Sequence, residues 1–533
     1  MNNKLYLIAS ALIGFLFFAI CGGLNTLNVT DISFLMSGDP AQHWLGWEFF
    51  RHTPLLQWPI GKNINYGIEL NNSIVYTDSI PIFAVFFKLF SFALPDKFQY
   101  TGIWLALCFM LQGVTSFLLV NKITKNNFYS LLASIIFITA TPFIHRTGGH
   151  FALSAHWLII ASVCLYFNEK YSSRKWVLLL VLASWVHAYI LAMMLVVWMA
   201  DLCTRYKKNE FTIDKFLYLI VTVGIYILVA MYVIGYFSIS NSFSAGGFGY
   251  YKLNLNSFVN PFYEPYSSII KPLPAGKGDY EGINYLGFGV LLMIAITFCS
   301  AKIQKIKLHT LIKSHYILFA FAVLTTLYAL SSNITLGENT IIAFYIPKVL
   351  EGITNSFRAS GRFAWVAYYL ISVAVIVGTY KIFNKRNATI ILFACTFINV
   401  YDVHHIFKER RNSYSKITTD YLIKSPNWDY VKKEYTKLLA VSPWDFSEES
   451  IKWAYYASTN NMSMNFGYFA RFNGDAWEKQ TKEINDAVNS GKLDDKAVYL
   501  FKDKSHYESV LHKLGSSAFS FEDNGVYVIG LKK

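Results

Sequence analysis

The sequence predicts a mainly helical membrane protein with about 11 spans and a small C-terminal α/β domain. Of its 533 residues, 54% are hydrophobic and only 15% are charged, whereas soluble domains carry about 25% charged residues. Mean hydropathy is +0.34. Apolar runs recur as far as residue 405, and charged and polar residues become frequent after it. These observations predict a membrane-spanning domain over 1–405 and a soluble domain over 406–533.

A membrane-spanning helix needs about 20 apolar residues. The run 176–203 is too long for one helix, has His187 in its middle and has basic residues on both flanks. We therefore expect it to cross twice, as a hairpin with His187 near the outer face. The first run lacks a small-residue cleavage site, so we expect a retained helix. Single spans are expected at 5–25, 100–121, 127–144, 152–168, 213–237, 284–301, 311–331, 363–383 and 387–405.

Basic residues between the apolar runs set the expected topology. Lys and Arg in short loops favour the cytoplasmic side, which accounts for much of the net charge of +14 without invoking nucleic acid. The N-terminus is then inside and the C-terminal domain outside. The segment 80–94, with Pro81 and Lys88, is too short to cross and is expected to be re-entrant or interfacial. The expected outer loops are 26–77, 145–151, 238–283 and 332–362.

The C-terminal region has the pattern of a small α/β domain. Short β-prone runs lie at 437–442, 496–502 and 525–530. Charged helical stretches lie near 475–491 and 505–514. The six cysteines all lie in or beside apolar segments, so no disulfide framework is expected.

The first outer loop holds the leading candidate for chemistry. A helix beginning at Asp39 would carry His43, Trp47 and Arg51 on the same face, at steps of four residues. Capping explains Asp39-Pro40-Ala41-Gln42, because Asp at the N-cap and Pro after it start helices well. Capping does not explain the residues that continue the face, so a helix cap and a catalytic carboxylate both stay open. Lys62 and Asp78 follow in the same loop.

A second cluster contains Arg146, His150 and His156. Their spacing matches no common zinc pattern, so we expect a turn that faces substrate and no metal site. The alternative is a polar turn with interfacial His and Trp side chains.

Two further loops carry binding candidates. Tyr280 and Glu281 follow the aromatic run 246–251, and stacked rings beside carboxylates suit a sugar. Arg358 and Arg362 precede a span at its expected outer end and could clamp a lipid phosphate. Interfacial anchoring of the tyrosines and snorkelling of the arginines are the alternatives.

The sequence contains no Walker A motif and no Gly-rich nucleotide fingerprint. A transferase with these outer-face residues would therefore use a lipid-phosphate donor instead of a cytoplasmic nucleotide.

The chain resembles the GT-C superfamily of membrane glycosyltransferases, which use polyprenyl-linked sugars. Asp39-Pro40 is similar to the Asp-Pro-aromatic run of oligosaccharyltransferases, and the run 58–62, Trp-Pro-Ile-Gly-Lys, is similar to their Trp-Pro-Leu-Gly-Arg run. The strings 38–43, 149–157 and 357–363 resemble a bacterial GT-C-like family without assigned function. Loop 145–151 offers His and Arg where oligosaccharyltransferases offer acids, so metal-independent transfer is expected, with no cofactor.

The resemblance implies an inverting glycosyltransferase in a bacterial inner membrane. Asp39 would be the general base, and a polyprenyl-phosphate or pyrophosphate sugar would be the donor. The acceptor would be a glycan of the cell envelope, such as lipopolysaccharide O-antigen or teichoic acid, or a protein. A flippase for a lipid-linked glycan, without chemistry, is the alternative function. A third possibility is an outer-face acyl- or phosphotransferase that acts on a glycan with the same base and another donor.

Overall fold

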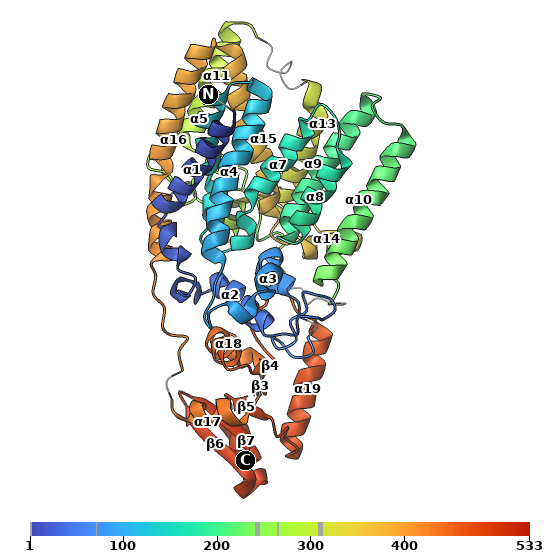
Figure 1. Cartoon of the computed structure of the whole chain (residues 1–533), viewed down its shortest axis with the longest axis vertical. Helices are drawn as coiled ribbons and strands as arrows, with labels where there is room; N and C mark the ends of the chain where they lie inside the picture. Colours follow the sequence, from blue (N-terminus) through green and yellow to red (C-terminus); the bar gives the residue numbers. More distant parts are fainter. Residues whose placement is uncertain (1–2, 71, 240–245, 264–265, 307–312, 424) are drawn as a thin grey trace. The chain divides into compact units, whose positions relative to one another are not determined.

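The computed structural model describes residues 3–70, 72–239, 246–263, 266–306, 313–423 and 425–533 (Figure 1). The chain is mostly helical and has a small sheet near its C-terminus, as the sequence predicts. It divides into two compact units. Unit 1 comprises Met1–Asn28, Tyr100–Ile227 and Gly246–Ser415, and unit 2 comprises Val29–Gln99, Leu228–Ala245 and Lys416–Lys533.

Unit 1 is built from apolar helices. Helix α4 packs against α1, α5 and α7, while α9 packs against α7, α8 and α13 (Figure 1). Helix α11 packs against α15 and α16. The helices are α1 (Asn3–Ile20), α4 (Thr101–Thr124), α5 (Asn127–Ile138), α6 (Thr141–Arg146), α7 (His156–Tyr166), α8 (Ser173–Ser184), α9 (Ala188–Lys207), α10 (Ile213–Ile234, which continues into unit 2), α11 (Phe288–Ile303), α13 (Tyr316–Leu330), α14 (Lys348–Ser356), α15 (Trp365–Ile382) and α16 (Lys385–Tyr414).

Seven helices in the described part of the chain are long and apolar enough to cross a membrane. They are α1, α4, α9, α10, α13, α15 and α16. The spans of α13 and α15 include the short 3₁₀ turn that precedes each helix. Three shorter apolar helices, at Asn127–Ile138, Phe151–Tyr166 and Phe288–Ile303, accompany them. These lengths and compositions identify a membrane protein.

Two of the expected apolar runs are interrupted. The expectation of one helix over 127–144 is wrong, because α5 ends at Ile138 and α6 begins at Thr141 with Pro142 in its first turn. Proline has no backbone N–H and a fixed φ, so it starts a helix more readily than it continues one. The expected break in 176–203 is confirmed, because the run forms two helices, α8 and α9, that pack together. Of these two helices, α9 is long enough to cross a membrane. His187 caps α9, since its Nδ1 accepts a hydrogen bond from Tyr189 N at 3.1 Å.

Other parts of unit 1 differ from the sequence prediction. The helix expected over 387–405 continues to Tyr414. The loop 332–362 contains an antiparallel hairpin, β1 (Asn333–Leu336) with β2 (Asn339–Ala343), and the helix α14, which the sequence analysis did not predict.

Unit 2 contains a mixed five-stranded sheet with the order β4-β3-β5-β7-β6. Strand β3 is parallel to β4 and β5, and β7 is antiparallel to β5 and β6. The strands are β3 (Lys437–Ala440), β4 (Ser463–Met464), β5 (Ala497–Phe501), β6 (Ala518–Asp523) and β7 (Val526–Leu531). The helices are α2 (Asp39–Arg51), α3 (Pro81–Lys88), α17 (Asn427–Glu434), α18 (Ser450–Thr459), α19 (Gly474–Ser490) and α20 (Lys504–Leu514).

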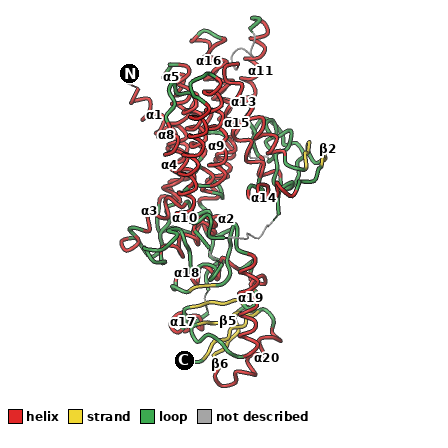
Figure 2. The backbone as a smooth tube through the Cα atoms, turned by 90° about the vertical axis from the view of Figure 1, so that its right-hand side faces the viewer, coloured by secondary structure: helices red, strands yellow, loops and turns green. Residues whose placement is uncertain are grey.

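Helices cover the sheet of unit 2, where strands are yellow and helices red (Figure 2). Val488 of α19 and Val510 of α20 pack with Tyr499 of β5 in one hydrophobic core. Trp428 of α17 packs against Phe521 of β6 and Trp453 of α18. The predicted strands at 437–442, 496–502 and 525–530 and both predicted helices are confirmed.

The first loop of the chain pairs with the C-terminal domain inside unit 2. Met464 N donates to Asn65 O at 3.0 Å, and Ala470 N donates to Tyr76 O at 2.9 Å. The buried ring of Tyr66 stacks on Phe49 at a centroid distance of 4.5 Å and contacts Phe469 at 4.7 Å. The loop and the domain are therefore one folded body.

The segment 80–94 contains α3, which has eight residues and is too short to cross a bilayer. Lys88 at its end is buried, and its Nζ donates to Thr53 Oγ1 at 2.6 Å and Pro54 O at 3.0 Å. Burial lowers the pKa of Lys88 to about 8. These bonds attach α3 to the end of α2.

Candidate functional site

Asp39 lies at the start of α2 in unit 2. The N-cap residue is Gly38, not Asp39, with φ 59° and ψ −145°, a conformation that glycine adopts without strain. Asp39 is the first helical residue and is half-buried. Its Oδ1 accepts a hydrogen bond from the Tyr468 hydroxyl at 2.6 Å. The carboxylate therefore contacts the C-terminal domain, a role that capping alone does not require.

Tyr468 is a site residue that sequence reasoning missed. Its backbone N donates to the Tyr66 hydroxyl at 3.0 Å. A Cβ built on Gly467 would lie 2.4 Å from the Tyr66 ring, so glycine is needed for this approach. The only sequence signal is the aromatic run 466–469, which lies more than 400 residues from Asp39.

Asp78 lies in a strained turn beside α2. Both Asp78 (φ 52°) and Ile80 (φ 51°) occupy the left-handed region, which is costly for a β-branched residue such as Ile80. Ser79 Oγ between them donates to His43 O at 2.7 Å. Gln42 Nε2 donates to Tyr76 O at 3.3 Å. The turn that carries Asp78 therefore packs against the first two turns of α2.

The predicted stripe below Asp39 is present, since one helix carries His43, Trp47 and Arg51 and all three are buried. Trp47 Nε1 donates to Phe98 O at 3.0 Å. Arg51 donates to Asp96 O at 2.9 Å and to the neighbouring Pro95 O at 3.0 Å. Trp47 and Arg51 thus hold the backbone of segment 95–98.

Lys62 is half-exposed at the edge of the same loop, where its backbone forms an isolated bridge with Ser73. The preceding Gly61 lies against the backbone of Ile234, because an added Cβ would be 2.0 Å from Ile234 O. The Trp-Pro-Ile-Gly-Lys run is therefore fixed by close backbone packing, with Trp58 exposed.

Unit 1 contains a buried charged cluster of Arg146, Glu281 and Arg362. Glu281 Oε2 accepts from Arg146 Nη2 and from Arg362 Nε, each at 2.7 Å. The guanidinium of Arg146 also lies over the Trp365 ring, and that of Arg362 over the Tyr189 ring. Two cations share one carboxylate, so the cluster keeps a net positive charge.

His150 adds to this cluster, with its Nε2 3.8 Å from Glu281 Oε1. Burial alone would raise the pKa of Glu281, but the guanidinium groups of Arg146 and Arg362 hold it well below its usual range. Burial and the neighbouring Arg146 hold the pKa of His145 well below its usual range. The cluster therefore contains an ionised carboxylate and could attract a further anion.

Two other predicted residues of unit 1, His156 and Tyr280, have contacts outside the cluster around Glu281. His156 is fully buried, shares a 2.8 Å hydrogen bond with the Tyr369 hydroxyl and packs on Trp365 at 4.1 Å. This placement is that of a core histidine. Tyr280 is half-buried and contacts the Tyr251 ring edge-on at 5.9 Å.

Arg358 and Arg362 have different acceptors. Arg358 Nη1 donates to Gly246 O at 3.4 Å, whereas Arg362 bonds to Glu281. The structure thus does not aim the two side chains at a common protein partner. Over the residues that the structure describes, no group of three or more His, Cys, Asp or Glu side chains is placed to hold a metal ion.

Comparison with known proteins gives a family without an assigned activity. Residues 11–404 match the model of DUF6311, described as a domain of unknown function. Residues 427–530 match the model of the DUF6311 C-terminal domain. No curated protein matches the chain. Because the first model covers well over half of the 533 residues, the chain belongs to the DUF6311 family.

Proposed function

We propose that the protein is an inverting membrane glycosyltransferase of GT-C type. It moves a sugar from a polyprenyl-phosphate or pyrophosphate donor to a glycan acceptor of the cell envelope. Its N-terminus lies in the cytoplasm of a bacterium, its chain crosses the inner membrane about eleven times, and its C-terminal domain lies outside.

The observation that carries this proposal is the environment of Asp39. Its carboxylate is half-buried at the start of α2, where the positive end of the helix dipole favours a negative charge. Tyr468 orients one oxygen through a 2.6 Å hydrogen bond. If Asp39 served only to stabilise the start of α2, it would not need a hydrogen bond from Tyr468, which lies more than 400 residues away in the sequence.

In the proposed reaction, a carboxylate oxygen of Asp39 takes the proton of an acceptor hydroxyl. The hydroxyl oxygen forms a bond to the anomeric carbon while the bond from that carbon to the phosphate oxygen breaks. The lipid phosphate leaves with the electron pair, and one displacement inverts the anomeric carbon. General base catalysis of this kind contributes roughly 10²–10⁴-fold.

The other residues predicted from the sequence are proposed to bind substrate, some in unit 2 and the others in unit 1. His43, Trp47, Arg51, Lys62 and Asp78 belong to the substrate-binding set of unit 2. Their support is packing around α2, and the fixed bonds of Trp47 and Arg51 give these two a positioning role.

In unit 1, the lipid-phosphate role of Arg358 and Arg362 is supported by the net positive charge of the cluster around Glu281. A phosphate that entered this cluster would meet guanidinium donors in a buried setting, where charge-assisted hydrogen bonds are strong. Arg146, His150, His156, Tyr280 and Glu281 complete the proposed substrate-binding set.

The test is transfer of radiolabelled sugar by the purified protein in lipid. The donors are a panel of polyprenyl-phosphate sugars, the acceptor is a membrane glycan extract, and one arm contains a chelator. We expect Asp39→Asn to abolish transfer while the protein stays folded, because an Asn oxygen can still accept from Tyr468. Asp96→Asn makes the same chemical change at an exposed position of the same unit and should keep full activity.

Transfer that persists in Asp39→Asn would overturn the assignment of the base, and loss of transfer with chelator would overturn metal independence. The interruption between α8 and α9 favours the second candidate, a flippase, because transporters bind substrates at broken helices. Labelled lipid that crosses the bilayer without any transfer, equally in both variants, would establish that function instead.

A further inference from the structure

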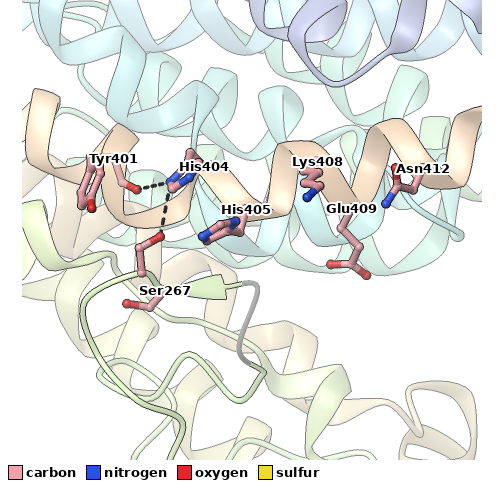
Figure 3. Close-up of a pocket in the computed structure, with 8 residues that line it drawn as sticks. Ser267, Tyr401, His404, His405, Lys408, Glu409 and Asn412 are labelled. Atoms are coloured by element: carbon pink, nitrogen blue, oxygen red, sulfur yellow. Dashed lines mark hydrogen bonds between the residues drawn. The ribbon is translucent and has the colours of Figure 1, made fainter.

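The second half of α16 borders a cavity of about 560 Å³ that the proposed reaction does not use (Figure 3). Six of its lining residues lie on α16, and two, Ser267 and Ser268, lie on a neighbouring loop. The α16 residues are Tyr401, His404, His405, Lys408, Glu409 and Asn412. The lining therefore offers several hydrogen-bond donors, one ammonium group and one carboxylate.

The basic groups of this cavity are exposed and have little protein bonding. Among the described residues, the Lys408 ammonium and the His405 imidazole make no hydrogen bond or ion pair. His404 Nδ1 bonds to Tyr401 O at 2.6 Å, which leaves its Nε2 as the available ring nitrogen. The carboxylate of Glu409, which also lines the cavity, pairs with Arg410 at 2.8 Å, which offsets its repulsion of an anion. The carboxylate of Asp402 accepts a hydrogen bond from the lining residue Ser267.

An apolar stripe leads along α16 to this cavity. Ile390, Phe393, Phe397 and Tyr401 are all exposed, and their spacing of three or four residues places them on one face of the helix. His404 and Lys408 continue the same face. The exposed side chains on this face thus change from apolar to basic between Tyr401 and His404, within one helical turn.

The length of α16 places this change at a membrane boundary. Its 30 residues extend about 45 Å, while a bilayer core is about 30 Å thick. A span that begins at Lys385 would leave the hydrocarbon near His404, at the level of the lipid phosphates. The stripe from Ile390 to Tyr401 is about 16 Å long, close to one leaflet.

We propose that His404, His405 and Lys408 bind the phosphate of an anionic glycerophospholipid whose acyl chain lies along the stripe. Lys408 supplies the positive charge, while the imidazoles, Asn412 and Ser268 supply hydrogen-bond donors for the phosphate oxygens. The match of the stripe to one leaflet favours a glycerophospholipid over a longer polyprenyl chain. This inference does not depend on the proposed transfer of sugar.

The test is a titration of the detergent-solubilised full chain with phosphatidylglycerol, with bound lipids counted by native mass spectrometry. We expect Lys408→Gln to weaken the apparent affinity about fivefold, the typical effect of one basic residue near a membrane surface. His405→Gln combined with Lys408→Gln should weaken it further. Phosphatidylcholine should bind more weakly than phosphatidylglycerol and should not respond to these substitutions.

The matched control is Lys385→Gln, which removes the same charge from the other end of the same helix. We expect this variant to keep the lipid. Inorganic phosphate at roughly 10 mM should not displace the lipid, because phosphate alone lacks the apolar contacts. An equal loss in Lys385→Gln, unchanged binding in the double variant, or displacement by phosphate would each overturn the proposal. Preferential binding of polyprenyl phosphate through Lys408 would overturn the choice of lipid. All of the substituted side chains are exposed, so the variants should fold.

Discussion

Asp39 and Tyr468 show how one hydrogen bond can connect chemistry to the fold. A carboxylate acting as a base must be held in a fixed orientation, and the Tyr468 hydroxyl donates to its Oδ1 at 2.6 Å. Tyr468 is itself fixed by the buried Tyr66, whose hydroxyl accepts from the Tyr468 backbone N. In the proposed reaction Tyr468 is therefore a positioning residue.

Tyr468→Phe should lower kcat for sugar transfer about 10–100-fold and leave KM nearly unchanged. A hydrogen bond to a charged group contributes roughly 1.5–3 kcal/mol, and each 1.4 kcal/mol is tenfold in rate. Tyr430→Phe is the control, because it removes a half-buried hydroxyl of the same domain. A kcat equal to that of the control would show that this hydrogen bond only supports the fold.

Glu281→Gln should destabilise unit 1 by about 3–5 kcal/mol, because two buried guanidinium groups would lose their shared charge partner. Since the folded-state pKa of Glu281 is depressed, its stabilisation is present above the ordinary pKa of about 4.3 and is lost as pH falls through the folded value. Thermal unfolding in detergent should thus show the greatest difference between wild type and variant near neutral pH.

The control for this comparison is Glu483→Gln, which breaks an exposed pair with Lys479 at 3.7 Å. Such surface pairs contribute about 0–1 kcal/mol, so its unfolding temperature should barely change. A Glu281 variant as stable as this control at neutral pH would contradict the assigned charge pairing.

At the scale of elements, α1 and α4 approach so closely that glycine is required on both helices. A Cβ on Gly14 would lie 2.2 Å from Phe109 O, and a Cβ on Gly113 would lie 2.3 Å from Ser10 O. Small residues let membrane helices pack backbone to backbone, where dispersion contacts replace the hydrophobic effect as the driving force.

Gly14→Ala and Gly113→Ala should each destabilise the α1–α4 packing by about 1–3 kcal/mol, the usual cost of overpacking. Thermal unfolding in detergent would measure the loss. Gly224→Ala, on α10 with no heavy atom within 4 Å of the added Cβ, makes the same change in open space. It should be neutral or slightly stabilising, since Ala favours helix. Equal stability of all three variants would contradict close α1–α4 packing.

Local patterns predicted the elements whose own residues determine them. The apolar length and broken middle of 176–203 indicated the break between α8 and α9, and short β-prone runs indicated β3, β5 and β7. The two edge strands, β4 and β6, were missed: β4 has only two residues, and β6 ends in the polar residues Glu522 and Asp523. The helix expected over 127–144 failed because the effect of Pro142 outweighed hydropathy.

The candidate site was predictable only where its residues are local. The face of Asp39, His43, Trp47 and Arg51 follows from helical spacing and is present. The partner Tyr468 and the shared carboxylate of Glu281 were not predictable, because contacts between residues far apart in sequence depend on how the chain folds in three dimensions. Arg146 and Glu281, for instance, are 135 residues apart.

On the scale of the whole molecule, unit 2 is assembled from three separate stretches of the chain. Ser73 Oγ donates to Ile234 O at 3.1 Å, which joins the first loop to the second stretch. Met464 and Ala470 join the loop to the third stretch through backbone hydrogen bonds. The conformation of the loop that carries Asp39 should therefore depend on the C-terminal domain.

Gly467→Val in the full chain tests this dependence. The new side chain would meet the Tyr66 ring, because the Cβ position is 2.4 Å from it. We expect the amides of residues 65–76 to lose protection from hydrogen exchange, measured by mass spectrometry, while the amides of α4 in unit 1 keep theirs. Gly352→Val, at a position with no heavy atom within 4 Å of an added Cβ, should leave both segments protected. If residues 65–76 exchange at the wild-type rate in Gly467→Val, the first loop holds its conformation without the C-terminal domain, and Tyr468 could not control the position of Asp39 through it.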